Sequence, residues 1–236
     1  MVTSLSDIDA DPVIDAGRVY AIGQGGRMVA LELNTGQRLW ELNIAGTGTP
    51  WVAGDFVFVI TDTAQLLAIA RTTITTQVHA LSDIDADPVI DQGRVYAIGS
   101  GGRMVALELN TGQRLWELNI AGTGTPWVAG DFVFVITDTA QLLAIARTTG
   151  RIRWMSQLQR FRDMEDRRGT ITWRGPVLAG GRLVLVNTLG QIIFASPTDG
   201  SVLQTVNTNT PISLAPVVAG NTLYILDDRG RLTAYR

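Results

Sequence analysis

The sequence predicts an all-β protein, a six-bladed β-propeller made of four-stranded antiparallel blades. One observation behind this prediction is a repeated landmark of a proline, an apolar residue, a turn and a strand. The landmark begins at Pro12, Pro50, Pro88, Pro126, Pro176 and Pro216. Successive prolines are 38 to 50 residues apart, a spacing typical of blades with four strands each. In addition, 46% of the residues are apolar and 17% are charged, which permits a large core.

The strands of one blade can be assigned in order along the first unit. Pro12 opens the inner strand, where a missing backbone N–H removes no hydrogen bond between strands. The second strand alternates polar and apolar residues, which is typical of a half-buried strand. The four expected strands are 12–14, 18–22, 27–33 and 38–44, separated by turns at 15–17, 25–26 and 34–36.

The two ends of the chain predict how the propeller closes. The last unit, from Pro216 to Tyr235, has room for only three strands. At the other end, residues 1–5 align with the outer-strand segment 77–81. We therefore expect the N-terminal strand to complete the last blade, which removes two open sheet edges from a single domain, 1–236.

An internal duplication accounts for much of the chain. Leu5–Thr73 matches Leu81–Thr149 except at Ala16/Gln92 and Gln24/Ser100. Residues 1–80 are thus a near-copy of the two blades in 81–156, and 157–236 form the last two blades with an inserted loop, 159–175. Natural repeats diverge further, so the copy is either very recent or engineered, and we favour an engineered origin.

Composition excludes several kinds of site. The net charge is −3, which does not suit a nucleic-acid-binding protein. There is no cysteine, so disulfides and thiolate chemistry are excluded, and the single histidine, His79, rules out multi-histidine zinc sites. We expect no transmembrane segment, because no apolar run approaches 20 residues, and no signal peptide in the first residues. No cofactor is predicted.

One motif resembles a known repeat. The segment Met28–Trp40, Met-Val-Ala-Leu-Glu-Leu-Asn-Thr-Gly-Gln-Arg-Leu-Trp, recurs at Met104–Trp116 and in part at Leu142–Trp154. It is similar to the repeat of quinoprotein-type propellers, in which the glycine makes a turn and the tryptophan packs between blades. Within that superfamily, Leu81-Ser-Asp-Ile-Asp-Ala-Asp-Pro-Val89 resembles the BamB family of the outer-membrane β-barrel assembly machinery.

This resemblance implies a periplasmic, outer-membrane-associated protein that binds other proteins, including the periplasmic domains of the barrel protein BamA. It also implies that the first two aspartates of each copy, Asp7, Asp9, Asp83 and Asp85, line a partner-binding rim. Three departures are visible. The family has eight blades where we count six, the lipidated cysteine is missing, and residues 43–49 lack the Leu/Arg pair of the family's BamA-binding loop.

Two alternative interpretations of the repeated aspartates remain open. Their side chains can bond backbone amides in a plain turn. Alternating aspartates also resemble the start of a calcium-binding loop, but the glycine and distant glutamate are absent and Pro12 interrupts the pattern.

The inserted loop is the second candidate partner-binding site. Long loops on rigid scaffolds often carry function, and arginines mixed with aromatic residues are typical of interface hot spots. The candidate residues are Arg160, Phe161, Arg162, Arg167 and Arg168, accompanied by Trp173. The alternative is a solvated loop held by weak internal salt bridges.

Three functions are therefore considered. The first is a non-catalytic, monomeric protein-binding scaffold of the BamB kind. The second is a quinoprotein enzyme using pyrroloquinoline quinone, for which no cofactor-binding constellation is visible. The third is a designed propeller with a purely structural purpose.

Overall fold

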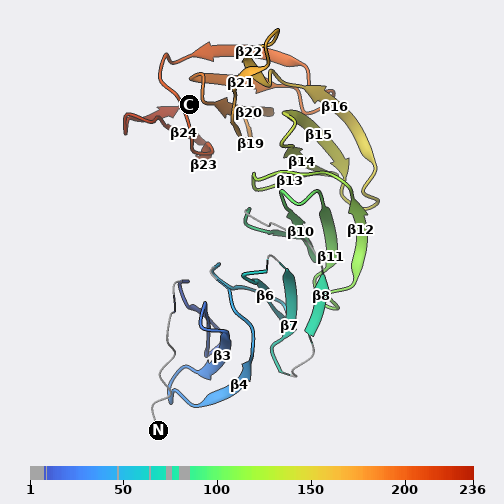
Figure 1. The fold of residues 1–236 in the computed structure, drawn as a ribbon, viewed down its shortest axis with the longest axis vertical. Helices are drawn as coiled ribbons and strands as arrows, with labels where there is room; N and C mark the ends of the chain where they lie inside the picture. The colour runs from blue at the N-terminus through green and yellow to red at the C-terminus, as the bar shows by residue number, and fades with distance from the viewer. Residues whose placement is uncertain (1–7, 9, 47, 64, 73–75, 80–85) are drawn as a thin grey trace. The chain divides into compact units, whose positions relative to one another are not determined.

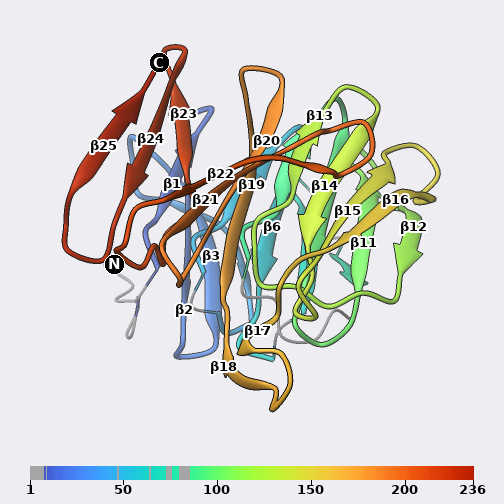
Figure 2. The ribbon, with the colours of Figure 1, turned by 90° about the horizontal axis from the view of Figure 1, so that it is seen from above.

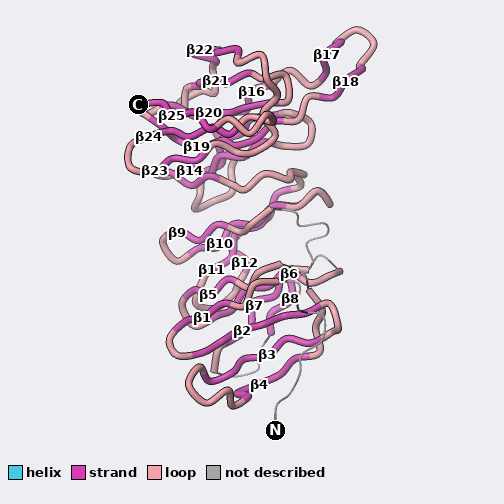
Figure 3. Tube along the Cα trace, turned by 90° about the vertical axis from the view of Figure 1, so that its left-hand side faces the viewer, coloured by secondary structure: helices cyan, strands magenta, loops and turns pink. Residues whose placement is uncertain are grey.

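The computed structural model describes residues 8, 10–46, 48–63, 65–72, 76–79 and 86–236. Within these ranges all regular secondary structure is β, and Figure 3 shows strands and loops without a helix. The chain forms two compact units. Unit 1 comprises Met1–Ile84, Gln92–Val95 and Leu107–Arg114, and unit 2 comprises Asp85–Asp91, Tyr96–Ala106 and Leu115–Arg236.

Unit 1 contains two complete four-stranded sheets, each with its strands in chain order (Figure 1). The first consists of β1 (Val13–Asp15), β2 (Arg18–Gly23), β3 (Arg27–Glu32) and β4 (Arg38–Leu42). The second consists of β5 (Trp51–Ala53), β6 (Phe56–Ile60), β7 (Leu66–Ala70) and β8 (Thr76–His79). All neighbouring strands are antiparallel, so the strands predicted for the first unit are confirmed to within two residues at each end.

The remaining sheets follow the same order. One, whose residues are divided between the two units, consists of β9 (Val89–Asp91), β10 (Arg94–Ile98), β11 (Met104–Glu108) and β12 (Arg114–Leu118). Unit 2 then adds β13 (Trp127–Ala129), β14 (Phe132–Ile136), β15 (Gln141–Ala146) and β16 (Ile152–Gln157), followed by β19 (Trp173–Ala179), β20 (Arg182–Asn187), β21 (Gln191–Ala195) and β22 (Val202–Asn207).

The last sheet has three strands in the part of the chain that the structure describes. They are β23 (Val217–Ala219), β24 (Thr222–Leu226) and β25 (Leu232–Tyr235). This agrees with the three strands expected after Pro216. Residues 1–5, the predicted fourth strand, lie outside the described residues, so closure by the N-terminus stays a prediction.

Apolar cores lie between successive sheets within each unit. In unit 1, Tyr20 and Met28 of the first sheet pack with Val57 and Leu67 of the second. In unit 2, one core joins β13–β16 to β19–β22 and another joins β19–β22 to β23–β25. A sheet between two neighbours is therefore covered on both faces.

This arrangement corrects the half-buried strand expected at 18–22. Tyr20, Ala21 and Ile22 are consecutive and all buried, although their side chains point to opposite faces of the sheet. Tyr20 and Ile22 belong to the core shared with the second sheet, and the burial of Ala21 between them makes this part of the strand buried at every residue. Ala21 is one of the small residues that are buried in this strand.

The Glu-Leu-Asn-Thr-Gly turn after β3 is stabilised by its own glutamate. Glu32 accepts hydrogen bonds from the Thr35 amide at 2.6 Å and the Thr35 hydroxyl at 2.5 Å, and another from the Asn34 side chain at 3.3 Å. The Thr35 hydroxyl contributes most, the backbone amides of Thr35 and Asn34 follow, and together they lower the pKa of Glu32 below its ordinary value. Glu108 has the same turn and the same direction of pKa shift, with Thr111 as the main cause.

Substituting Glu32→Gln should make the protein less stable at neutral pH but not in acid. A lowered folded pKa means that the ionised carboxylate stabilises the fold above the unfolded pKa, and that this contribution is lost as pH falls through the folded pKa. The difference in urea midpoint between wild type and variant should therefore shrink as the pH falls from 7 to below the ordinary glutamate pKa. Thr35→Ala should reproduce part of the effect, and a pH-independent difference would contradict it.

Two of the turn glycines, Gly150 and Gly200, lie against a tryptophan of the preceding sheet. A Cβ atom on Gly150 would lie 2.9 Å from Trp116 ring atoms, and one on Gly200 would lie 2.5 Å from Trp154 Cζ3. Both glycines have positive φ, 71° and 74°. The glycine is therefore required both by the turn and by the close approach of the indole.

Candidate functional site

The inserted segment, expected from the sequence as a long loop, contains a β-hairpin. Strand β17 (Phe161–Asp163) pairs with β18 (Arg168–Thr170), and Figure 2 shows the hairpin extending beyond the end of β19. Asp163 Oδ1 accepts hydrogen bonds from the amides of Glu165 and Asp166, both at 3.0 Å. This aspartate turn, which sequence spacing did not single out, closes the hairpin tip.

The predicted arginines gather on this hairpin. Arg160, Arg162, Arg167 and Arg168 are all exposed, and Phe161 is half-buried. The Arg160 guanidinium lies over the Phe161 ring at 5.2 Å, and Arg168 pairs loosely with Asp166 at 3.9 Å. Arg162 reaches back to the Thr188 carbonyl at 3.5 Å. The hairpin thus presents several cations whose internal pairing is weak, because exposed ion pairs contribute little.

The base of the hairpin is rigidly attached to the sheet. Ile171 is buried, and its amide donates to the Arg160 carbonyl at 2.9 Å. Trp173, which the sequence grouped with the hot-spot residues, is also buried, and its Nε1 donates to the Gln159 carbonyl at 2.8 Å. Trp173 therefore anchors the hairpin and is not part of its exposed surface. Beside it lies a small pocket of about 170 Å³, which Thr123, Thr137 and Thr170 help to line.

The predicted partner-binding rim falls on aspartates for which the structure gives no description. Asp7, Asp9, Asp83 and Asp85 lie outside the described residues, while their neighbours Asp11 and Asp87 are exposed. The partner-binding rim therefore stays a prediction.

A second feature, which the sequence did not reveal, is an arginine inserted between sheets. In unit 1, Arg71 donates from Nε to Tyr20 Oη at 3.0 Å and from Nη1 to the Gly54 carbonyl at 3.1 Å, and its Nη2 lies 2.6 Å from Asp15 Oδ2. Burial alone would lower the pKa of this guanidinium, but Tyr20 and Asp15 raise it above the ordinary arginine value. The ion pair and the phenol hold the charge between the sheets.

The duplicated pair of sheets repeats this arrangement within unit 2. Arg147, whose side chain is only 5% exposed, donates to the Gly130 carbonyl at 3.0 Å and forms an ion pair with Asp91. Trp116 Nε1 donates to the Arg147 carbonyl at 2.9 Å. Tyr96 Oη and Arg147 Nε are buried without a hydrogen bond to any residue that the structure describes. This second copy is therefore less completely satisfied than the first.

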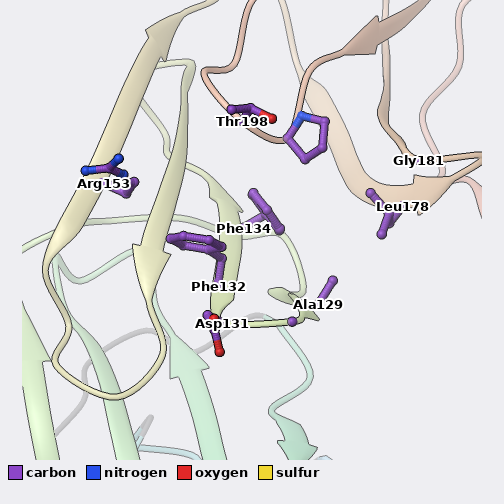
Figure 4. A pocket seen from close by; sticks show the side chains of 10 residues that line it. Ala129, Asp131, Phe132, Phe134, Arg153, Leu178, Gly181 and Thr198 are labelled. Carbon is purple, nitrogen blue, oxygen red and sulfur yellow. The ribbon is translucent and has the colours of Figure 1, made fainter.

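The next interface lacks the arginine and has a pocket instead. Here Trp154 Nε1 donates to the Pro197 carbonyl at 3.1 Å, so Pro197 occupies the position of Arg147. We call the resulting space, about 480 Å³, the Pro197 slot. Figure 4 shows side chains converging on it from β13, β14, β16 and β19. Its lining comprises Ala129, Gly130, Asp131, Phe132, Phe134, Arg153, Leu178, Gly181, Pro197 and Thr198.

A comparison of aligned repeats would have found this slot. The positions that hold Asp, Tyr and Arg at one interface hold Ala129, Phe134 and Pro197 at the other.

Two further observations concern sites of other kinds. The described residues contain no group of three or more metal-ligating side chains that could hold an ion. They also form no helix of the length and hydropathy needed to cross a membrane.

Repeated four-stranded antiparallel sheets, joined through a glycine–tryptophan contact, define a β-propeller protein of the PQQ-like repeat class. Matching against known families narrows this assignment. The chain belongs to the family described as outer membrane protein assembly factor BamB, whose model matches residues 1–73 and 67–156.

Curated relatives carry the same description. The chain is 28% identical over 228 residues to the protein from Alkalilimnicola ehrlichii, covering 96% of this chain and 51% of that one. It is 28% identical over 246 residues to that of Yersinia pestis, covering 95% of this chain and 60% of that one. The chain therefore spans between half and two thirds of the length of these relatives.

Solved structures show the same fold. BamB from Moraxella catarrhalis aligns with a TM-score of 0.52 and 19% identity, over 98% of this chain and 84% of that one. The computationally designed Ika8 protein aligns with a TM-score of 0.64 and 13% identity, over 97% and 70%.

Proposed function

We propose that the chain is a non-catalytic protein-binding scaffold of the BamB kind, with the β17–β18 hairpin as its partner-binding surface. The partner would be the periplasmic domains of BamA or a protein like them, and the protein would be periplasmic and associated with the outer membrane. The observation that carries the proposal is the family membership across residues 1–156. The relatives' description as assembly factors supports a binding role.

The hairpin suits such a role on physical grounds. Its four arginines are exposed, and its base is fixed by Ile171 and Trp173, so binding would order few side chains beyond the arginines themselves. Arginine is enriched at interface hot spots because its guanidinium both stacks and forms several hydrogen bonds. An acidic partner surface would also be attracted electrostatically, which favours fast association.

The proposal includes a complete propeller. A single domain, 1–236, of six blades would be closed by residues 1–5 pairing with the last sheet, whose three described strands leave room for a fourth. Such a closed domain would be monomeric, since closure leaves no sheet edge free to pair with another copy.

A binding measurement with immobilised BamA periplasmic domains tests the partner surface. Arg167→Glu with Arg168→Glu should weaken binding by about tenfold or more, because it replaces two cations with repelling anions. The matched control is Arg229→Glu with Arg231→Glu, a pair of exposed arginines in the turn between β24 and β25, which should leave affinity within about twofold. Failure of the wild-type chain to bind, or equal losses in the two variants, would refute this assignment.

A further inference from the structure

The Pro197 slot can be compared with a second site of identical sequence. Residues 126–149 repeat residues 50–73 without a difference, so Gly130 is the copy of Gly54, and both have a φ of 55°. A Cβ atom on Gly54 would lie 3.6 Å from Leu109 Cγ and 3.3 Å from Asn110 Oδ1. A Cβ atom on Gly130 would meet nothing within 4 Å. The position beside this glycine is thus covered in one copy and uncovered in the other.

Backbone hydrogen bonds identify Leu109 as the equivalent of the inserted arginines. The Leu109 amide donates to the Gly93 carbonyl at 2.8 Å, as the Arg147 amide donates to Asp131 at 2.9 Å and the Arg71 amide to Asp55 at 2.8 Å. Pro197 stands at this position in its own sheet and has no amide hydrogen to donate. Its side chain is also shorter than the leucine or arginine found at this position in the other sheets, and this is why space is left.

The walls of the slot select the kind of side chain that fits. Where arginine fills the position, an aspartate and a tyrosine face it, as Asp91 and Tyr96 face Arg147. In the Pro197 slot these residues are Ala129 and Phe134, so a buried guanidinium would lose both partners. At the interface in unit 1 whose wall residues have this same apolar sequence, a leucine side chain occupies the equivalent position. An aliphatic side chain is therefore favoured over a cation.

The slot is open to a partner. Of its lining residues, Asp131, Arg153 and Thr198 are polar and exposed, and the Arg153 side chain makes no hydrogen bond or ion pair with the described residues. A volume of about 480 Å³ lies within the range of known ligand sites. Polar groups around an apolar floor suit a peptide better than a wholly apolar small molecule, because they can meet its backbone and flanking residues.

We propose that the Pro197 slot binds a leucine side chain presented by a protein segment of the type Glu-Leu-Asn-Thr, the sequence that covers the identical surface in unit 1. This inference is independent of the hairpin and of BamA. It predicts a second contact point on the protein, at the opening between β13–β16 and β19–β22.

The test uses a peptide copied from residues 108–112, acetyl-Glu-Leu-Asn-Thr-Gly-amide, and methyl NMR of the full chain. Saturable shifts are expected at the Ala129 and Leu178 methyl groups. Replacing the peptide's leucine by glycine or arginine should weaken binding about tenfold or more, since most of the affinity comes from the buried isobutyl group. Hexanol at equal concentration should cause smaller shifts.

Two variants fill the slot from opposite walls. Pro197→Leu and Ala129→Leu should each abolish the shifts, and either alone suffices if the other fails to fold. Ala219→Leu, at the position equivalent to Ala129 but in the last sheet, should leave the peptide response unchanged. The proposal is overturned by an absent response in the wild-type chain, by equal responses to the glycine peptide or to hexanol, or by persistent shifts in the filled variants.

Discussion

Gly150→Ala is expected to destabilise the fold by about 2–5 kcal/mol, because the new Cβ atom causes both backbone strain and a steric clash. The residue has a φ of 71°, a region in which a Cβ atom is strained. The new methyl group would also lie 2.9 Å from Trp116 Cγ and Cδ2. The indole cannot move away cheaply, since it is buried and its Nε1 donates to the Arg147 carbonyl.

Gly36→Ala is a matched control that separates backbone strain from the clash with the tryptophan. Gly36 occupies the same place in the first Thr-Gly turn, with a φ of 68°, but a Cβ atom there would meet nothing within 4 Å. Its substitution should therefore cost only the backbone strain, about 1 kcal/mol. Urea unfolding followed by tryptophan fluorescence measures both variants. Equal losses in the two variants would show that contact with Trp116 contributes nothing.

The glycine turns and the strands were predictable because their signals are local. A proline at the start of an inner strand and a glycine with positive φ, such as Gly17, mark each hairpin within a few residues. The inserted hairpin was less accessible. Its turn depends on Asp163 accepting two amides, and Arg167 there has a positive φ of 54° that arginine does not favour. Sequence composition therefore predicted the exposed arginines but not the paired strands that carry them.

The contacts between sheets could not be predicted from local sequence patterns. Arg71 and Arg147 look like ordinary surface arginines at strand ends, and their partners Asp15 and Asp91 lie 56 residues earlier in the chain. Only alignment of whole repeats shows that the charged position becomes leucine at 109 and proline at 197. The candidate slot depends on that difference across sheets, whereas strand prediction depends on periodicity within one.

Arg147→Leu is expected to destabilise the protein by about 2–3 kcal/mol. The substitution removes a charged hydrogen bond to the Gly130 carbonyl and the ion pair with Asp91. The loss is smaller than for a fully buried pair because the Asp91 side chain is 38% exposed and can be hydrated after the change. Arg151→Leu, on an exposed residue four positions later, should change stability by no more than about 0.5 kcal/mol.

Adding Asp91→Ala and Tyr96→Phe to Arg147→Leu should recover at least about 1 kcal/mol of the loss, although three polar groups are then removed. The triple variant carries the set found at Ala53, Phe58 and Leu109. It removes the carboxylate that has lost its partner and a phenol oxygen that is buried without a hydrogen bond to any described residue. Urea midpoints of the single and triple variants measure this coupling. Additive effects of the three changes would mean that Asp91, Tyr96 and Arg147 act as independent residues. They would also contradict the use of Leu109 as a guide to the side chain that fits beside Ala129 and Phe134.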